Sequence, residues 1–148
     1  MSPSSTVVVE VAHSEHQNWR VSRLLAEEYI LGSNLEVRVV VGVNLEYEKT
    51  KRAVFSVWRA KQREDEVWVV ETVVRNRTFR NDDDKSTTDN QTLGLRLRLE
   101  DFADEKTCQR FKAKDKSFKD RDIFVSCDEM YGYLERAEAM DETAAKAQ

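Results

Sequence analysis

Proline and glycine are scarce in this chain, with one proline and four glycines among 148 residues. The composition, 40% hydrophobic and 35% charged, is typical of a soluble globular domain with a heavily charged surface. A chain of this length suggests a single domain. We expect that domain at residues 7–140, between a short tail at 1–6 and a frayed tail at 141–148.

Cysteine is also rare, because only Cys108 and Cys127 occur. They form no CxxC pair, so we expect no zinc site built on them. The apolar runs are too short to span a membrane, and the N-terminal stretch has neither a basic region nor a cleavable apolar segment. We therefore expect an intracellular protein, cytoplasmic or nuclear, with reduced thiols and no membrane partner.

Several common catalytic signatures are absent from the chain. It contains no glycine-rich phosphate loop, no G-x-S-x-G elbow and no cysteine in a nucleophilic context. His13 and His16 have an H-x-x-H spacing, with Glu10 and Glu15 nearby, and neutral imidazole is a common metal ligand. Because the pair spans a predicted strand-to-helix boundary, exposed or capping histidines explain it better than a metal site.

The first third of the chain has a strand–helix–strand pattern. Apolar, β-branched runs at 7–12 and 36–46 are typical of buried strands. Between them, Ser14 and Gln17 fit a capping box at a helix start, and Gly32 fits the helix end. This order predicts a βαβ unit with parallel strands and a right-handed crossover.

The remainder predicts antiparallel strands and a closing helix. Valine-rich and aromatic-rich runs at 51–60 and 65–80 indicate two strands with a short polar turn between them. At 92–100, leucines alternate with glycine and arginine, which indicates a strand with one dry and one basic face. Residues 100–122 look irregular.

A short strand, IFVS, precedes a C-terminal helix, where Ser126 and Glu129 fit a second capping box. The predicted fold class is α/β with α+β margins. Its single mixed sheet would hold about five or six strands, with one helix after the first strand and one at the C-terminus.

Charge is unevenly distributed along the chain. The net charge is −4, yet residues 106–121 carry +5 and the rest −9. A solvated loop explains this segment best, because a globally acidic chain is a poor nonspecific binder of nucleic acid. Basic residues interleaved with Phe111 and Phe118 keep nucleic-acid binding open. The candidate contacts are Arg110, Lys112, Lys114, Lys116 and Lys119.

Glu10 is a lone carboxylate inside the first apolar strand. On a strand it shares a face with Val8 and Ala12. An isolated carboxylate in apolar surroundings resists ionisation, so it needs a metal, a cation or hydrogen-bond donors. The simplest structural explanation is an ion pair with Arg20 or Arg23 of the following helix.

The segments VVVEVAHSE, NWRVSRLLAEEYILG and VRVVVGVNLE together resemble the core of the restriction-endonuclease-like fold, in the PD-(D/E)xK nuclease superfamily. The similarity is greatest to the Uma2-like branch and to a set of uncharacterised fungal proteins. TLGLRLRLEDFA and IFVSCDEMYGYLERAE also resemble the tails of those fungal proteins.

The resemblance implies a Mg²⁺ site in which two carboxylates hold the metal and a lysine assists the attacking water. Glu10 matches the acid of the second half-motif, and Arg20 or Arg23 would replace the lysine, whose position is taken by Ala12. Thr6 stands where the first acid of the pair would be. A cation held by one carboxylate and waters would bind weakly.

Two functions follow from this incomplete motif. The leading prediction is a degenerate, non-catalytic nuclease-like domain that needs no cofactor and acts by binding a macromolecule, namely a protein. The alternative is a weak or unconventional Mg²⁺-dependent DNA nuclease. A complete acid pair would favour the nuclease, and the sequence contains only Glu10.

Overall fold

The fold was analysed in a computed structural model that describes residues 6–13, 19–46, 50–83, 93–102, 105–114 and 122–146. In chain order its elements are β1 (Thr6–Ala12), α1 (Trp19–Gly32), β2 (Val37–Leu45), β3 (Ala53–Gln62), β4 (Trp68–Arg80), β5 (Gly94–Arg98), α2 (Leu99–Phe102), α3 (Glu105–Lys114), β6 (Asp122–Ser126) and α4 (Cys127–Lys146).

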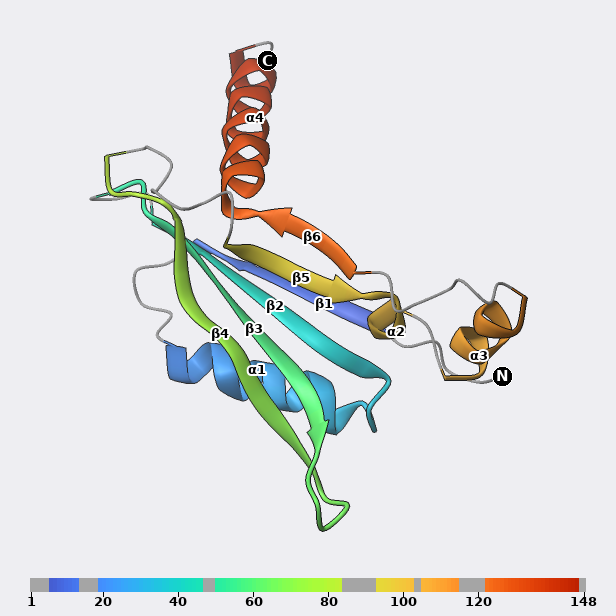
Figure 1. The fold of residues 1–148 in the computed structure, drawn as a ribbon. Coiled ribbons are helices and arrows are strands. Elements are labelled where there is room, and N and C mark those ends of the chain that lie inside the picture. Colours follow the sequence, from blue (N-terminus) through green and yellow to red (C-terminus); the bar gives the residue numbers. More distant parts are fainter. Residues whose placement is uncertain are drawn as a thin grey trace.

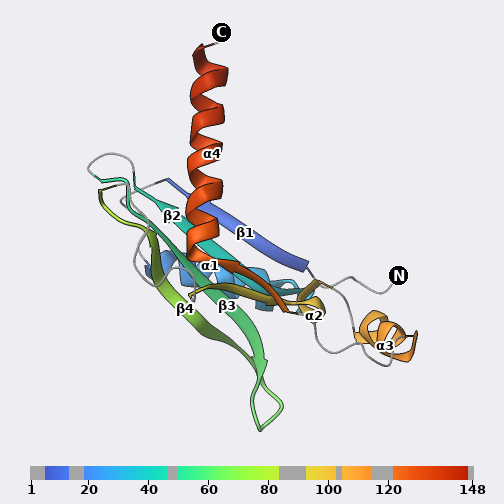
Figure 2. The same ribbon diagram turned by 45° about the horizontal axis from the view of Figure 1, so that its top comes forward.

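The fold is mixed α+β, with a four-stranded sheet in the order β1-β2-β3-β4. β1 and β2 are parallel and joined by α1, so the predicted βαβ unit is confirmed. β3 and β4 continue the sheet as antiparallel strands, also as predicted. Figure 1 shows α1 on one face of the sheet and the β5–β6 pair on the other, and Figure 2 agrees from a second direction.

The prediction of one sheet with five or six strands is wrong. β5 and β6 pair only with each other, antiparallel, in a separate two-stranded sheet. The alternating leucines explain this arrangement, because Leu97 is buried in the core of the main sheet while Arg96 and Arg98 are exposed. The dry face of β5 therefore covers the main sheet instead of extending its edge.

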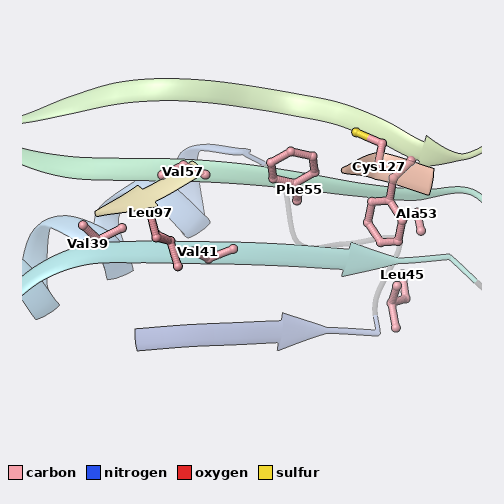
Figure 3. Close-up of a cluster of buried hydrophobic side chains, with 9 residues drawn as sticks. Val39, Val41, Leu45, Ala53, Phe55, Val57, Leu97 and Cys127 are labelled. Carbon is pink, nitrogen blue, oxygen red and sulfur yellow. The ribbon is translucent and has the colours of Figure 1, made fainter. Parts of the chain in front are cut away.

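Two apolar clusters hold the layers together, one on each face of the sheet. The cluster under β5, β6 and the start of α4 centres on Phe55 and Phe79, whose ring centroids lie 6.2 Å apart. Figure 3 shows Leu97 and Cys127 reaching this cluster from β5 and α4. The cluster under α1 joins Ala26 and Ile30 of the helix to residues of the sheet, including Trp58.

The end of α1 differs from the sequence-based expectation. Gly32 is the last helical residue, but the left-handed positions are Asn34 (φ 57°) and Leu35 (φ 68°). The amides of Leu35 and Asn34 donate to the carbonyls of Ile30 and Leu31, at 3.1 and 3.2 Å, as in a Schellman motif. Asn34 is thus the C′ residue, because asparagine tolerates the left-handed region well.

The predicted capping box of the C-terminal helix is confirmed. The Glu129 amide donates to Ser126 Oγ at 3.0 Å, and the Ser126 amide donates to Glu129 Oε1 at 3.4 Å. The helix continues to Lys146, which differs from the frayed tail expected from residue 141. The other predicted box, Ser14 with Gln17, lies outside the described residues.

Arg80 at the end of β4 joins α4 to the rest of the molecule. Its side chain is fully buried and pairs with Glu135 at 3.2 Å and Glu138 at 2.8 Å, one turn apart on α4. Its Nε donates to the carbonyl of Lys51, just before β3. One side chain therefore links three segments that are distant in sequence.

The region expected to be irregular contains two helices, α2 and α3. Lysine, glutamine, arginine and alanine favour a helix even where no apolar face stabilises it, which explains α3. Among the described helices, none combines the length and the hydropathy needed to cross a lipid bilayer.

Candidate functional site

Glu10 lies on the face of β1 that is covered by α1. Its strand neighbours Val8 and Ala12 also lie on this side of β1. Val8 packs against the apolar cluster under α1, and Ala12 lines a small cavity. Tyr29 Oη, near the end of α1, donates a hydrogen bond to Glu10 Oε1. A hydroxyl donor therefore satisfies the carboxylate that the sequence singled out.

The arginine partners expected for Glu10 are engaged elsewhere. Arg23 Nε pairs with Glu27 at 3.3 Å on the outer side of α1, and its guanidinium lies over the Trp19 ring. Arg20 is exposed and makes no ion pair with any described residue. The predicted Glu10–arginine pair is therefore replaced by the Glu10–Tyr29 hydrogen bond, since both guanidinium groups extend toward solvent.

A small cavity of about 50 Å³ lies beside Glu10, between α1 and the sheet. Polar side chains from three further sheet positions line it: Asn44 of β2, Ser56 of β3 and Asn76 of β4. The Asn76 amide donates to Ser56 Oγ at 2.9 Å, across a bulge at which Asn76 has φ 44°. A polar row thus crosses the centre of an otherwise apolar sheet face.

Three buried polar atoms of this cavity's lining residues have no hydrogen-bond partner within the described part of the chain. They are Nε1 of Trp19, Nε1 of Trp58 and Oδ1 of Asn44. Trp58 is 1% exposed, so its indole N–H is remote from bulk solvent. Such groups carry a desolvation cost, and three of the five unsatisfied buried side-chain atoms of the described residues are gathered around this cavity.

Magnesium, the ion implied by the resemblance, does not fit this set of donors. Mg²⁺ prefers octahedral oxygen ligands and is usually anchored by one or two carboxylates. Among the described residues that line the cavity, Glu10 is the one carboxylate, and its Oε1 already accepts the hydrogen bond from Tyr29. The indole N–H groups of both tryptophans only donate, so they cannot bind a cation.

No other metal site emerges among the residues that can be placed. Over the described ranges, no three His, Cys, Asp or Glu side chains come close enough together to hold an ion. His13 is exposed at the end of β1, and His16 lies outside the described residues. Cys127 is fully buried, and burial raises the pKa of its thiol although Arg77 opposes this. Burial of that kind suits a structural thiol rather than a nucleophile.

The basic segment at 106–121 is described only in part. Arg110 and Lys114 are exposed on α3, whereas the Lys112 side chain and all of Lys116 and Lys119 fall outside what the structure describes. Figure 1 shows α3 projecting from the end of the molecule opposite the start of α1. Among the candidate nucleic-acid contacts, the two with described side chains, Arg110 and Lys114, therefore lie away from the start of α1.

Sequence reasoning identified Glu10 but missed Tyr29, Asn44, Ser56 and Asn76. Asn44 and Ser56 carry the same signal as Glu10, because each interrupts an apolar strand run, VVVGVNLE and AVFSVW. Tyr29 carries no such signal, since it occupies an ordinary apolar position of an amphipathic helix. Applying the rule for Glu10 to every strand would have found two of these four missed residues, Asn44 and Ser56.

The Glu10–Tyr29 hydrogen bond should affect the titration of the Tyr29 hydroxyl at alkaline pH. Glu10 raises the pKa of Tyr29 above its ordinary value of 10.0 in two ways. Its carboxylate accepts the hydrogen bond of the neutral hydroxyl, and its negative charge disfavours the tyrosinate. We expect Glu10→Gln to lower that pKa toward the ordinary value, because the substitution removes the charge. Ultraviolet absorbance of tyrosinate during titration measures this, and Tyr29→Phe identifies which transition belongs to Tyr29.

The same shift sets the direction of the stability change with pH. The folded-state pKa of Tyr29 lies above the unfolded one, so its contribution is complete below the unfolded value of about 10. It is lost as the pH rises through the folded value. In Glu10→Gln this alkaline loss should be smaller or absent, because the folded-state pKa then lies closer to the unfolded one. Identical titration and melting curves for both proteins would contradict the assignment.

Comparison of the chain with protein-family models, with curated proteins and with solved structures yields no match. The conclusions about function therefore depend on the geometry of the molecule and on the residues of its own sequence.

Proposed function

We propose that this chain is a degenerate nuclease-like domain that does not cleave nucleic acid and instead binds another protein. The observation that carries the proposal is the set of groups around the Glu10 carboxylate. Its carboxylate accepts a hydrogen bond from Tyr29, and no second carboxylate occurs among the described residues that line the neighbouring cavity. The nuclease resemblance implies two carboxylates that hold Mg²⁺ together, and the described lining residues supply only one of them.

The polar row beside Glu10 is also poorly suited to act on a polymer. The cavity of about 50 Å³ has room for a few water molecules but not for a phosphodiester with its sugars. The side chains around it include Trp58, which is packed in the core under α1. These features support a structural role for the row, in fixing how α1 lies on the sheet.

Protein is the favoured class of partner because of charge. The chain carries a net charge of −4, so its long-range field repels a polyanion. Protein interfaces tolerate such a charge, since they depend on local complementarity and buried apolar contacts.

Plasmid cleavage tests the non-catalytic part of the proposal. We expect the protein to leave supercoiled plasmid intact in the presence of Mg²⁺ or Mn²⁺, because the residues around Glu10 do not form a metal site. The measurement is gel electrophoresis after prolonged incubation, with a known Mg²⁺-dependent endonuclease as the positive control. Glu10→Gln should behave identically.

One outcome would establish the nuclease alternative instead. Metal-dependent nicking by the unmodified protein that disappears in Glu10→Gln would show that Glu10 is catalytic. Nicking that persists in Glu10→Gln would indicate a contaminating nuclease, and repeated purification of both proteins separates these two cases.

A further inference from the structure

An open, basic groove lies on the outer side of α1, separate from the cavity beside Glu10. Five residues of α1, Trp19, Arg20, Arg23, Leu24 and Glu27, line it together with Arg75 of β4. We refer to these six residues as the arginine groove. Its volume is about 810 Å³, which is ample for several residues of an extended peptide.

Trp19 forms the floor of the arginine groove and orients two of its cations. The guanidinium carbon of Arg75 lies 4.0 Å from the centroid of the Trp19 ring, and that of Arg23 lies 5.4 Å from it. Stacking on an indole face holds a guanidinium in place while leaving its N–H edge free to donate. Two elements distant in sequence, α1 and β4, are thus drawn together around one ring.

The positive charge of the groove is not neutralised by its surroundings. Arg20 and Arg75 make no ion pair with any residue in the described part of the chain. Arg23 pairs with Glu27, but both side chains are substantially exposed, at 46% and 35%, so a competing carboxylate can displace that contact. Three arginines and one glutamate give the groove a charge of +2, on a chain whose net charge is −4.

We propose that the arginine groove binds an acidic segment of a partner protein. The stacked Arg75 and the nearby Arg20 would each donate paired N–H groups to a carboxylate of that segment. Leu24, which is 63% exposed, offers an apolar contact beside them. This inference rests on the proposed protein-binding function and names the chemistry of the partner.

The arrangement of charge favours an acidic protein segment over a nucleic acid. A polynucleotide gains affinity by releasing counterions along many phosphates, which requires an extended basic track. The start of α1, where most residues of the arginine groove lie, and the basic helix α3 are far apart in both ribbon views (Figures 1 and 2), so they do not form such a track. A local site of charge +2 suits two carboxylates of one short segment.

Binding of short anionic probes tests the proposal. Fluorescence anisotropy would measure a labelled hexaglutamate peptide and a labelled hexathymidylate strand, which carry similar charge, against the full chain at low ionic strength. We expect hexaglutamate to bind with a dissociation constant of about 1 mM or tighter and in preference to hexathymidylate. Arg75→Glu and Arg20→Glu should each weaken peptide binding about tenfold or more. Each replaces a guanidinium that donates to the peptide's carboxylates with a carboxylate that repels them.

Arg136→Glu is the matched control. Arg136 is exposed on α4 and also lies over an aromatic ring, 4.9 Å from the Tyr133 centroid, but it is not part of the groove. This variant has the same change of charge and should alter peptide binding by less than about twofold. Far-ultraviolet circular dichroism of the three variants verifies that each is folded.

Three results would overturn the inference. The groove is not the binding site if the peptide does not bind, or if Arg75→Glu and Arg20→Glu leave its binding unchanged. In either case, a plasmid that stays intact still supports the proposed non-catalytic function. Preference for hexathymidylate that is lost in both groove variants would assign the groove to phosphates. That last result would also count against a protein-binding function, so the two failures are distinguishable.

Discussion

Arg80→Ala should lower the free energy of unfolding by about 3 kcal/mol. The guanidinium is fully buried and pairs with Glu135 and Glu138 of α4, so its removal deprives both carboxylates of this counter-charge. The side chains of Glu135 and Glu138 are 37% and 20% exposed, so water reaches both carboxylates once the arginine is removed. The expected cost is therefore at the lower end of the range for breaking a buried ion pair. Urea unfolding followed by circular dichroism measures the loss.

Arg136→Ala serves as the control for this experiment. It removes an exposed arginine of α4, and we expect a change within about 0.5 kcal/mol. If Arg80→Ala unfolded at the same urea concentration as the unmodified protein, the link between β4 and α4 would have to be energetically neutral. That result would contradict the role assigned to Arg80.

Gly94→Ala is expected to destabilise the protein by a similar amount, about 3 kcal/mol. Gly94 begins β5 opposite Ser126, the last residue of β6. A β-carbon at residue 94 would lie 2.7 Å from the Cα of Ser126 and closer still to the carbonyl oxygen of Val125. Because both obstacles are backbone atoms, the two strands must separate to admit the methyl group. Thermal unfolding of the variant measures the effect.

Gly132→Ala provides a matched substitution with the opposite expected sign. Gly132 lies within α4, and apart from the adjacent backbone of that helix no atom of the described residues lies within 4 Å of the position that a β-carbon would take there. Alanine should therefore stabilise the helix by about 0.5–1 kcal/mol. Equal effects of the two alanine substitutions on the free energy of unfolding would show that the close approach of β5 to β6 does not exclude a β-carbon at residue 94.

The elements that were predicted correctly carry their signal locally. The βαβ unit follows from two β-branched runs around an amphipathic helix, and the start of α4 follows from Ser126 and Glu129 alone. Each strand or helix in these predictions is recognised from residues within a few positions of one another. Local patterns of this kind survive folding because tertiary contacts reinforce them.

The errors arose where distant segments decide the outcome. The alternation in β5 indicated a strand but not its partner, and β5 pairs with β6 above the sheet. Arg80 reads as an ordinary charged residue at a strand end, and nothing near it reveals that α4 will bury it. For the candidate site, the apolar run around Glu10 correctly indicated a partnered carboxylate. The partner, Tyr29, depends on how far α1 extends before the chain turns back.

The layer formed by β5, β6 and the start of α4 also determines the order in which the protein can be completed during synthesis. The sheet face that carries Phe55 and Phe79 belongs to strands that end by residue 80, whereas the segments covering it begin at residue 93 and finish within α4. β3 and β4 are joined by a short turn and can pair early. A ribosome-bound chain thus presents an uncovered aromatic surface until its last third emerges, which is the interval when it most needs a chaperone.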